Sequence, residues 1–296
     1  MKILPVHKKC AIVLLAMAAV VPASAQYNNQ QQQPPMGANG VTLNAQLVKT
    51  GLYLFSSEGS NTLLRLSANG LILVDGQPLT AYDTLRARVR KISDQPVRAL
   101  ILTNSYQSHI GTNAKFLEAG ARLIVQQNAK QNLASDSPPG GAVAPPTMTY
   151  DKEYLLRLGG VEAQLFHFGN AHTNGDTVVY FPHQKVVAVG DLFASTPNPD
   201  FSAGGSMVGW GPVLAQILKL DFDVVVPGTG PMVTRLELDA FKTKIDTVVS
   251  RATELVKKGV PKDQLMSQLK TDDLGWHLSF TGDQLDGFYA ELSGAK

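Results

Sequence analysis

The chain has 296 residues, of which 44% are hydrophobic, 17% charged and 7% aromatic. This composition is typical of a globular protein and excludes a collagen, a coiled coil and a fully disordered chain. The formal net charge is +2, but three of the 26 basic residues lie in the first nine positions, and the remaining 23 face 24 acidic residues. We therefore expect no nucleic acid partner.

The first 25 residues are predicted to be a secretory signal peptide. Basic residues precede an apolar run at 11–21, and small residues at 23–25 provide a cleavage pattern. The apolar run is much shorter than the ~20 residues that a membrane-spanning helix needs, and no later segment comes close. We expect an exported protein, periplasmic or secreted, with no membrane span after removal of the signal peptide.

The only cysteine of the chain, Cys10, lies inside the predicted signal peptide. The mature protein is therefore expected to have no disulfide, no thiolate metal ligand and no cysteine nucleophile. Residues 26–40 are rich in glutamine, asparagine and proline and show no apolar periodicity, which predicts a flexible tether. The folded domain is expected to span residues 41–296.

The first half of this domain begins with short apolar runs and then alternates between strand and helix. Asn69-Gly70 predicts a hairpin turn. The predicted strands are residues 52–55, 62–66, 71–74, 99–103 and 122–125. The predicted helices are residues 81–92 and 113–119. Residues 135–146 form a long loop, either a rim over a site or a slack connection.

The second half repeats the same order of strands followed by helices. The predicted strands are residues 154–158, 161–168, 177–181, 185–189 and 224–226. The predicted helices are residues 213–220, 236–259, 262–269 and 283–292, the last three as surface helices. Because both halves have strands followed by helices, we expect an α/β fold with two sheets packed face to face and helices outside, a four-layer αββα sandwich.

Four predicted strands end in glycine and polar residues. These segments are residues 102–111, 169–176, 189–192 and 225–230. Because α/β folds place ligands at the carboxyl ends of strands, we expect His109, His172 and Asp191 to meet at one point. Of the other histidines, His183 and His277 are expected on the surface. His167 is expected either to pack on its strand or to touch the site.

The four segments and their order resemble the metallo-β-lactamase superfamily of metal-dependent hydrolases. In that family they read T-H-x-H-x-D-H-x-G, a G-x-x-H-T-x-G-D-like turn, G-D-L and P-G-H-G. The similarity runs from about residue 52 to 236, and Val74-Asp75-Gly76 matches the strand-end Asp motif of the family. The resemblance implies an αββα domain that binds two metal ions, usually zinc, which activate a water molecule for hydrolysis.

Four of the seven metal-ligand positions implied by this resemblance carry other residues. His109, His172 and Asp191 are retained, and the substituted positions are Asn104, Tyr106, Ser108 and Thr229. Neutral amide, phenol and hydroxyl oxygens are poor zinc ligands compared with imidazole and carboxylate. We therefore do not expect a tight two-metal site.

Two interpretations of the retained residues remain open. In one, His109, His172 and Asp191 hold a single zinc, manganese or iron ion, and the protein is an active hydrolase of an ester, lactone, amide or thioester. In the other, which we prefer, no metal binds. The four neutral replacements line a polar pocket, and each can donate a hydrogen bond, as a buried Asp191 needs once its cations are lost. The pocket is then kept to bind a small molecule or a partner.

A third arrangement would use Ser108, His109 and Asp191 as nucleophile, base and orienting acid. Adjacent serine and histidine residues in one loop rarely point at each other, which argues against it. Asp75, Thr173 and Asp176 are expected either to support the site residues from behind or to stabilise the turns at the strand ends.

Overall fold

The computed structural model describes residues 41–135 and 145–294, without the side chains of residues 134 and 135. These residues belong to one compact unit. The predicted signal peptide, the predicted tether and most of the predicted long loop lie outside the described residues. Among the described helices, none is long and apolar enough to cross a membrane.

The first sheet has seven strands in the order of the chain. They are β1 (Asn44–Lys49), β2 (Leu52–Ser56), β3 (Asn61–Ser67), β4 (Gly70–Val74), β5 (Val97–Ile101), β6 (Arg122–Gln126) and β7 (Met148–Tyr150). Strands β1 to β4 pair antiparallel, and β4 to β7 pair parallel. The parallel half places the carboxyl ends of β4, β5 and β6 at one edge of the sheet.

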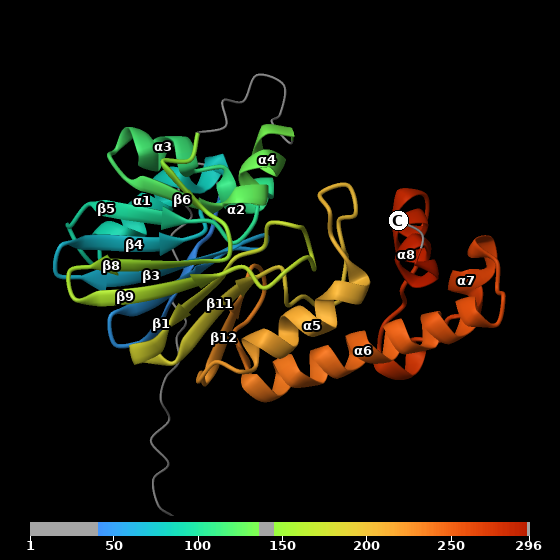
Figure 1. The fold of residues 1–296 in the computed structure, drawn as a ribbon. Coiled ribbons are helices and arrows are strands. Elements are labelled where there is room, and N and C mark those ends of the chain that lie inside the picture. The colour runs from blue at the N-terminus through green and yellow to red at the C-terminus, as the bar shows by residue number, and fades with distance from the viewer. Residues whose placement is uncertain (1–40, 136–144, 295–296) are drawn as a thin grey trace, which may run out of the picture. The chain divides into compact units, whose positions relative to one another are not determined.

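The second sheet has six strands in the order β13-β12-β11-β10-β9-β8. Their bounds are β8 (Glu153–Leu158), β9 (Val161–Phe166), β10 (Val178–Phe181), β11 (Val186–Gly190), β12 (Val224–Pro227) and β13 (Val233–Thr234). Only β11 and β12 pair in parallel. The two sheets pack against each other (Figure 1).

Alternation along the strands builds the core between the sheets. Within β4, Ile72 and Val74 face this core, whereas Leu71 and Leu73 face the outer helices. Such alternation follows from the two-residue period of a strand. The outer face of the first sheet is covered by α1 (Tyr82–Arg90), α3 (Asn113–Glu118) and α4 (Gln127–Ser135). Short segments η1 (Leu79–Ala81), η2 (Pro182–Gln184) and α2 (Gln107–Ile110) lie in connections.

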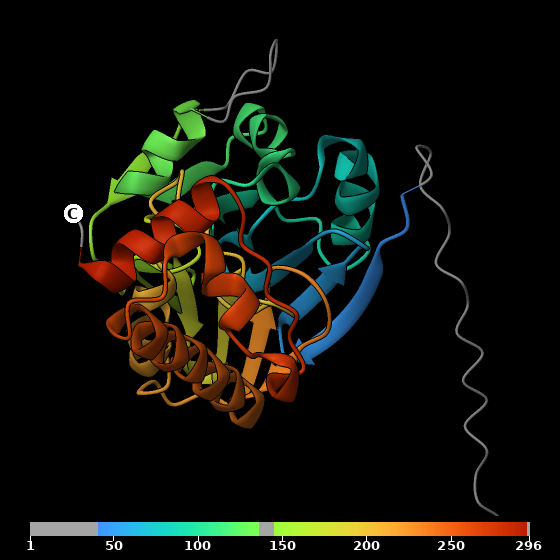
Figure 2. The same cartoon turned by 90° about the vertical axis from the view of Figure 1, so that its right-hand side faces the viewer.

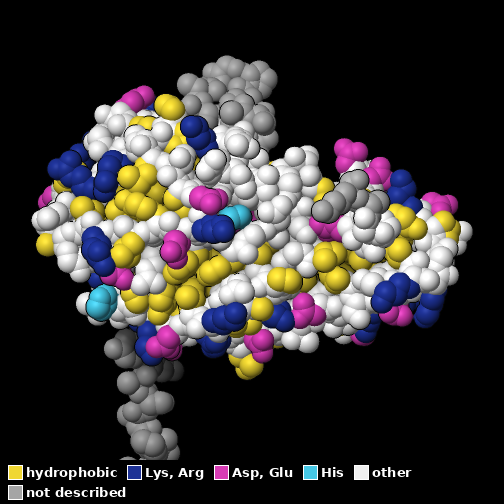
Figure 3. Space-filling view, viewed as in Figure 1, with side chains coloured by type: hydrophobic (Ala, Val, Ile, Leu, Met, Phe, Trp, Pro, Cys, Tyr) yellow, Lys and Arg dark blue, Asp and Glu magenta, His cyan; other side chains and the backbone are white. Residues whose placement is uncertain are grey.

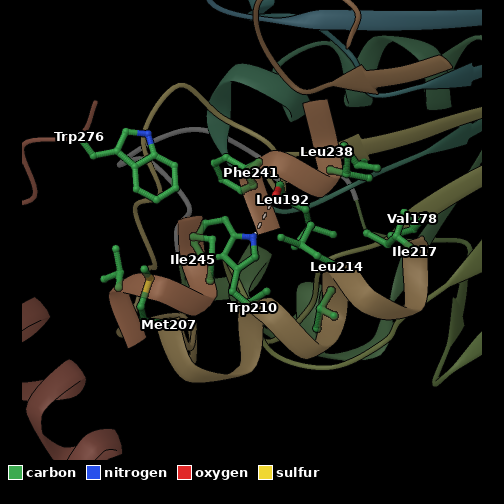
Figure 4. Close-up of a cluster of buried hydrophobic side chains, with 14 of the residues drawn as sticks. Val178, Leu192, Met207, Trp210, Leu214, Ile217, Leu238, Phe241, Ile245 and Trp276 are labelled. Atoms are coloured by element: carbon green, nitrogen blue, oxygen red, sulfur yellow. Dashed lines mark hydrogen bonds between the residues drawn. The ribbon is translucent and has the colours of Figure 1, made fainter. Parts of the chain in front are cut away.

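The second sheet is covered by a larger helical layer. It consists of α5 (Met207–Ile217), α6 (Arg235–Lys257), α7 (Lys262–Gln268), η3 (Asp272–Leu274) and α8 (Asp283–Ser293), drawn in yellow to red in Figures 1 and 2. Trp210 is fully buried among Phe241, Ile245 and Leu214, and its indole donates to the carbonyl of Leu192 at 3.0 Å (Figure 4). This layer anchors the segment that follows β11.

The predicted four-layer αββα sandwich is confirmed. One predicted helix was wrong in its position, because α5 begins at Met207 rather than at 213. Ser206 caps this helix by accepting a hydrogen bond from the Gly209 amide at 2.7 Å. The sequence analysis missed β1, β7, β13, α2 and α4. The missed strands β7 and β13 are very short, and α2 has a single turn.

Candidate functional site

The predicted polar segments meet where strands of the two sheets end. Asp75 follows β4, Asn104 follows β5, Asp191 follows β11 and Gly228 follows β12, while His109 lies in α2. The backbone amide of Gly228 donates to the carbonyl of Gly190 at 2.8 Å, which ties two of these ends together. The edge between the sheets thus carries a cluster of polar side chains.

His109 lies between two carboxylates. Its Nε2 atom is 3.1 Å from Oδ2 of Asp191, and its Nδ1 atom is 3.4 Å from Oδ2 of Asp75. The imidazole is fully buried, Asp75 is 4% exposed, and the Asp191 side chain is 16% exposed. Asp75, His109 and Asp191 thus form a row, and Asp191 is the member of this row whose side chain reaches solvent.

Asn104 completes the contacts of Asp191. Its Nδ2 atom donates to Oδ2 of Asp191 at 2.9 Å, and its Oδ1 atom accepts from the Tyr106 amide at 2.9 Å. The second hydrogen bond fixes which end of the amide faces the carboxylate. One oxygen of Asp191 therefore receives hydrogen bonds from both Asn104 and His109.

These contacts set the charges of the cluster. Burial alone would lower the pKa of His109, but the charges of Asp75 and Asp191 raise it to about 9. Burial opposes ionisation of Asp191, yet the hydrogen bond and charge of His109 lower its pKa to about 2. Burial raises the pKa of Asp75 to about 6. At neutral pH a buried imidazolium thus neutralises Asp191.

Backbone geometry holds the row in place. Asp75 has a φ of 58°, in the left-handed region, and its carboxylate accepts hydrogen bonds from the Thr103 amide at 2.7 Å and hydroxyl at 2.6 Å. Gly228 lies so close to the pair that an added Cβ would meet Oδ1 of Asp191 and come within 2.9 Å of Cε1 of His109. Only glycine fits there without displacing the pair.

His172 lies on the other side of the cluster. The ring of Tyr106 packs edge-on against it with 4.7 Å between centroids, and the Tyr106 hydroxyl donates to Oδ2 of Asp200 at 2.9 Å. The Nδ1 atom of His172 is 3.7 Å from Oδ1 of Asp176. Burial would lower the pKa of His172, but Asp176 raises it above its usual value.

Asp176 is itself held by Thr173, whose amide and hydroxyl donate to its two oxygens at 2.8 and 2.7 Å. Asp200 was missed by the sequence analysis. It lies between β11 and α5 and accepts hydrogen bonds from the Ser202 hydroxyl at 2.6 Å and the Ala203 amide at 3.1 Å. No motif marks it, and only its position after Asn198-Pro199 hinted at a structured turn.

The other predicted residues lie as follows. Ser108 is half-buried in α2, and Thr229 is exposed beside Gly228. The triad of Ser108, His109 and Asp191 is not formed, because both ring nitrogens of His109 face carboxylates.

The remaining histidines lie outside the cluster. His183 and His277 are exposed, as expected. His167 is half-buried, and its Nδ1 atom lies 2.9 Å from the carbonyl oxygen of Asp176, behind the site.

The donor set does not fit two zinc ions. Asn104 presents an N–H group to Asp191, and the Tyr106 hydroxyl points at Asp200, so neither directs a lone pair where a shared metal would lie. Among residues 41–135 and 145–294, no three His, Cys, Asp or Glu side chains are grouped as metal ligands.

Comparison with known proteins identifies the family. A family model described as the metallo-beta-lactamase superfamily matches residues 57–229, more than half of the chain. The chain belongs to the metallo-beta-lactamase superfamily. The matched segment contains every residue of the polar cluster, whereas α6, α7 and α8 lie beyond it.

Two relatives resemble the chain moderately in sequence. The alpha subunit of 2,4-dinitroanisole O-demethylase from Nocardioides sp. (strain JS1661) is 27% identical over 197 residues, 66% of this chain and 60% of that subunit. A type 2 metallo-beta-lactamase from Bacillus cereus is 27% identical over 196 residues, 62% of this chain and 72% of the relative. The chain thus spans well under two thirds of the demethylase subunit.

Solved structures of the superfamily share the fold. A metallo-beta-lactamase from Pontibacter korlensis superposes with a TM-score of 0.62 and 18% identity, covering 69% of this chain and 99% of that one. The DIM-1 metallo-beta-lactamase gives a TM-score of 0.60 and 19% identity, covering 70% and 99%. At such identities the match establishes the αββα architecture.

Proposed function

We propose that this chain is an exported member of the superfamily that has lost two-metal hydrolysis and keeps its site as a metal-free polar pocket for a small molecule. The observation that carries the proposal is the double hydrogen bond to Oδ2 of Asp191, from Asn104 and His109. The protein itself thus supplies two donors to the carboxylate that, by the family pattern, would be a metal ligand.

Two further observations support the proposal. Asp191 lies 3.1 Å from His109 and accepts from Asn104 at 2.9 Å, so protein groups satisfy one oxygen of this carboxylate. In addition, Asp191 keeps 16% of its side chain exposed, next to the exposed Thr229. Of the two carboxylates beside His109, Asp191 is therefore the one open to a ligand.

The alternative function is a mononuclear hydrolase that uses His109, His172 and Asp191 to hold one zinc, manganese or iron ion. It is favoured by the position of His172, whose charge contributes to lowering the pKa of Asp191 and which therefore lies near it. For this alternative, His109 must lose its proton and turn from a donor into a ligand. The chemistry supplied would be activation of water for hydrolysis.

Elemental analysis of the mature protein distinguishes the two functions. Residues 26–296 are purified without a chelator or a histidine tag, and metal content is measured before and after incubation with zinc, manganese or iron(II). We expect substoichiometric metal under every condition. One metal ion per chain that is lost in both His109→Gln and His172→Gln would overturn the proposal in favour of the hydrolase.

His277→Gln is the matched control, because its side chain is 88% exposed and distant in sequence from the cluster. Metal lost in this variant as well would indicate binding on the surface rather than at the site. Export is tested separately by fractionating cells that express the full chain or a chain without residues 2–25. The full chain is expected outside the cytoplasm, and equal retention of both chains in the cytoplasm would contradict export.

A further inference from the structure

A second candidate site lies on the outer face of the first sheet. A groove of about 240 Å³ opens between α1, α3 and the segment that leads into β5. This end of the sheet carries the start of β5, whereas the polar cluster follows the carboxyl ends of β4 and β5. The groove is therefore separate from the site described above.

The floor of the groove is apolar and aromatic. Tyr82 from α1 and Phe116 from α3 pack edge-to-face with 5.3 Å between ring centroids, and Val89 lies beside them. Phe116 and Val89 are buried, at 4% and 5% exposure, whereas Tyr82 is half-buried. Tyr82 is therefore the floor residue whose remaining surface a flat apolar group can cover.

The rim of the groove supplies hydrogen-bond donors without protein acceptors. Arg86 and Arg90 lie one helical turn apart on α1, both exposed, and neither makes an ion pair or hydrogen bond within the described part of the chain. Ser93 accepts a hydrogen bond from the Gln95 amide at 3.2 Å, which leaves its own proton free to donate. Of the described residues that line the groove, Asp94 is the one acidic residue.

The surroundings of the groove are also basic. Residues 82–98 contain five basic residues and two acidic ones, although basic and acidic residues nearly balance over the whole chain. Figure 3 shows Lys and Arg side chains gathered beside an apolar patch on the side where Figure 1 labels β5. Anions are therefore attracted to this end of the molecule.

We propose that this groove binds a small organic dianion with a flat apolar body, of which an aryl phosphate is the simplest example. Two guanidinium groups one turn apart match the charge and the oxygens of a phosphate, because each presents paired N–H donors. The Ser93 hydroxyl adds a third donor. The aromatic floor holds the body of the ligand, and Asp94 limits the affinity for the anion.

Titration of the mature protein with phenyl phosphate tests this proposal by calorimetry and by amide chemical shifts. We expect shifts confined to α1, α3 and residues 93–97. Arg86→Ala/Arg90→Ala should weaken binding about tenfold or more, because charge-assisted hydrogen bonds are lost. Lys91→Ala is the matched control, since it removes one neighbouring charge outside the groove, and should change affinity less than about twofold. Asp94→Asn should tighten binding.

Comparison ligands separate the parts of the proposal. Inorganic phosphate lacks the apolar body and benzyl alcohol lacks the charge, so both should bind at least about tenfold more weakly than phenyl phosphate. Benzoate has the apolar ring but a single charge, so its affinity should be lower than that of phenyl phosphate and higher than that of benzyl alcohol. Equal affinity for inorganic and phenyl phosphate, shifts elsewhere on the molecule, or equal effects of the double variant and Lys91→Ala would overturn the proposal. Thermal unfolding of each variant verifies that it is folded.

Discussion

The Nε2 atom of His109 lies 3.1 Å from Oδ2 of Asp191, and this contact joins the first sheet's α2 connection to the carboxyl end of β11 in the second sheet. The pair of His109 and Asp191 therefore helps to hold the two sheets together. It closes the edge between the sheets with one positive and one negative charge. Asp75 lies behind His109 and adds a second carboxylate to the same row.

Replacement of His109 by glutamine is expected to destabilise the protein by about 3 kcal/mol. Glutamine removes the buried positive charge and leaves Asp75 and Asp191 without their shared partner, and breaking a buried ion pair is costly. Urea unfolding at pH 7 measures the change, with EDTA and with zinc. A loss that appears only in the presence of zinc would contradict the metal-free pocket.

The control for this measurement is His277→Gln, since His277 pairs with Asp272 on the exposed surface. Surface ion pairs contribute little, so its loss is expected to stay below about 1 kcal/mol. An equal loss in both variants would show that His109 has no special role in the stability of the edge.

Restoring the ligand residues of the family should create metal binding. The variant combines Asn104→His, Tyr106→His, Ser108→Asp and Thr229→His, which returns imidazole and carboxylate ligands to all four substituted positions. We expect the metal content after incubation with zinc to rise from substoichiometric to between one and two ions per chain. Elemental analysis checks this, with Thr229→His alone as the control.

If the fourfold variant folds but binds no more zinc than the wild type, the four substitutions are not what prevents metal binding. The position of His172, whose Nδ1 atom lies 3.7 Å from Oδ1 of Asp176, would then be responsible, since this variant already lacks the ring of Tyr106. Adding Asp176→Asn to the fourfold variant tests this point, because it removes the carboxylate beside His172.

The sequence predicted the layers of the fold because most strands and helices are marked by an apolar run or by apolar periodicity. In β4, for example, every residue is buried, and alternate residues serve the two cores, which is the pattern of a central strand. Elements without such a signal were missed. The start of α5 depends on Ser206 as a cap, and this single hydrogen bond leaves no repeating pattern in the sequence.

The candidate site was predicted in outline for a similar reason. Glycine-rich strand ends and retained ligand residues marked His109 and Asp191, and the structure brings them into contact. The role of Asp200 could not be predicted, because its contact with Tyr106 joins residues 94 positions apart without any motif around the acid. The hydrogen-bond direction of Asn104 likewise depends on the folded backbone at Tyr106.

Gly228→Ala should disturb the site through packing alone. An added methyl group would meet the carboxylate of Asp191 and the ring of His109, so we expect a loss of about 2 kcal/mol in unfolding free energy. Gly59→Ala is the matched control, because no atom lies within 4 Å of its added Cβ and its φ is not positive. Similar losses in the two variants would mean that Asp191 and His109 can shift to accommodate the methyl group without lowering the free energy of unfolding.

Glu237 predicts a pH dependence at the start of α6, away from the polar cluster. Thr234 caps this helix, and its amide and hydroxyl donate to Oε2 of Glu237 at 2.7 and 2.8 Å. These hydrogen bonds lower the pKa of Glu237 below its ordinary value of 4.5. A lowered pKa means that the ionised carboxylate stabilises the folded state above pH 4.5 and that this contribution disappears as pH falls through the folded value.

The variant Glu237→Gln isolates this contribution, since glutamine keeps the shape and one acceptor oxygen but carries no charge. The wild type should have the higher Tm at pH 7, where the carboxylate also interacts favourably with the helix N-terminus. The difference in Tm should shrink as the pH is lowered from 5 towards 3, because the carboxyl of the unfolded chain is protonated below about pH 4.5 and that of the folded chain at lower pH. Circular dichroism at a series of pH values measures it, and a difference that stays constant down to pH 3 would show that the charge of Glu237 does not stabilise α6.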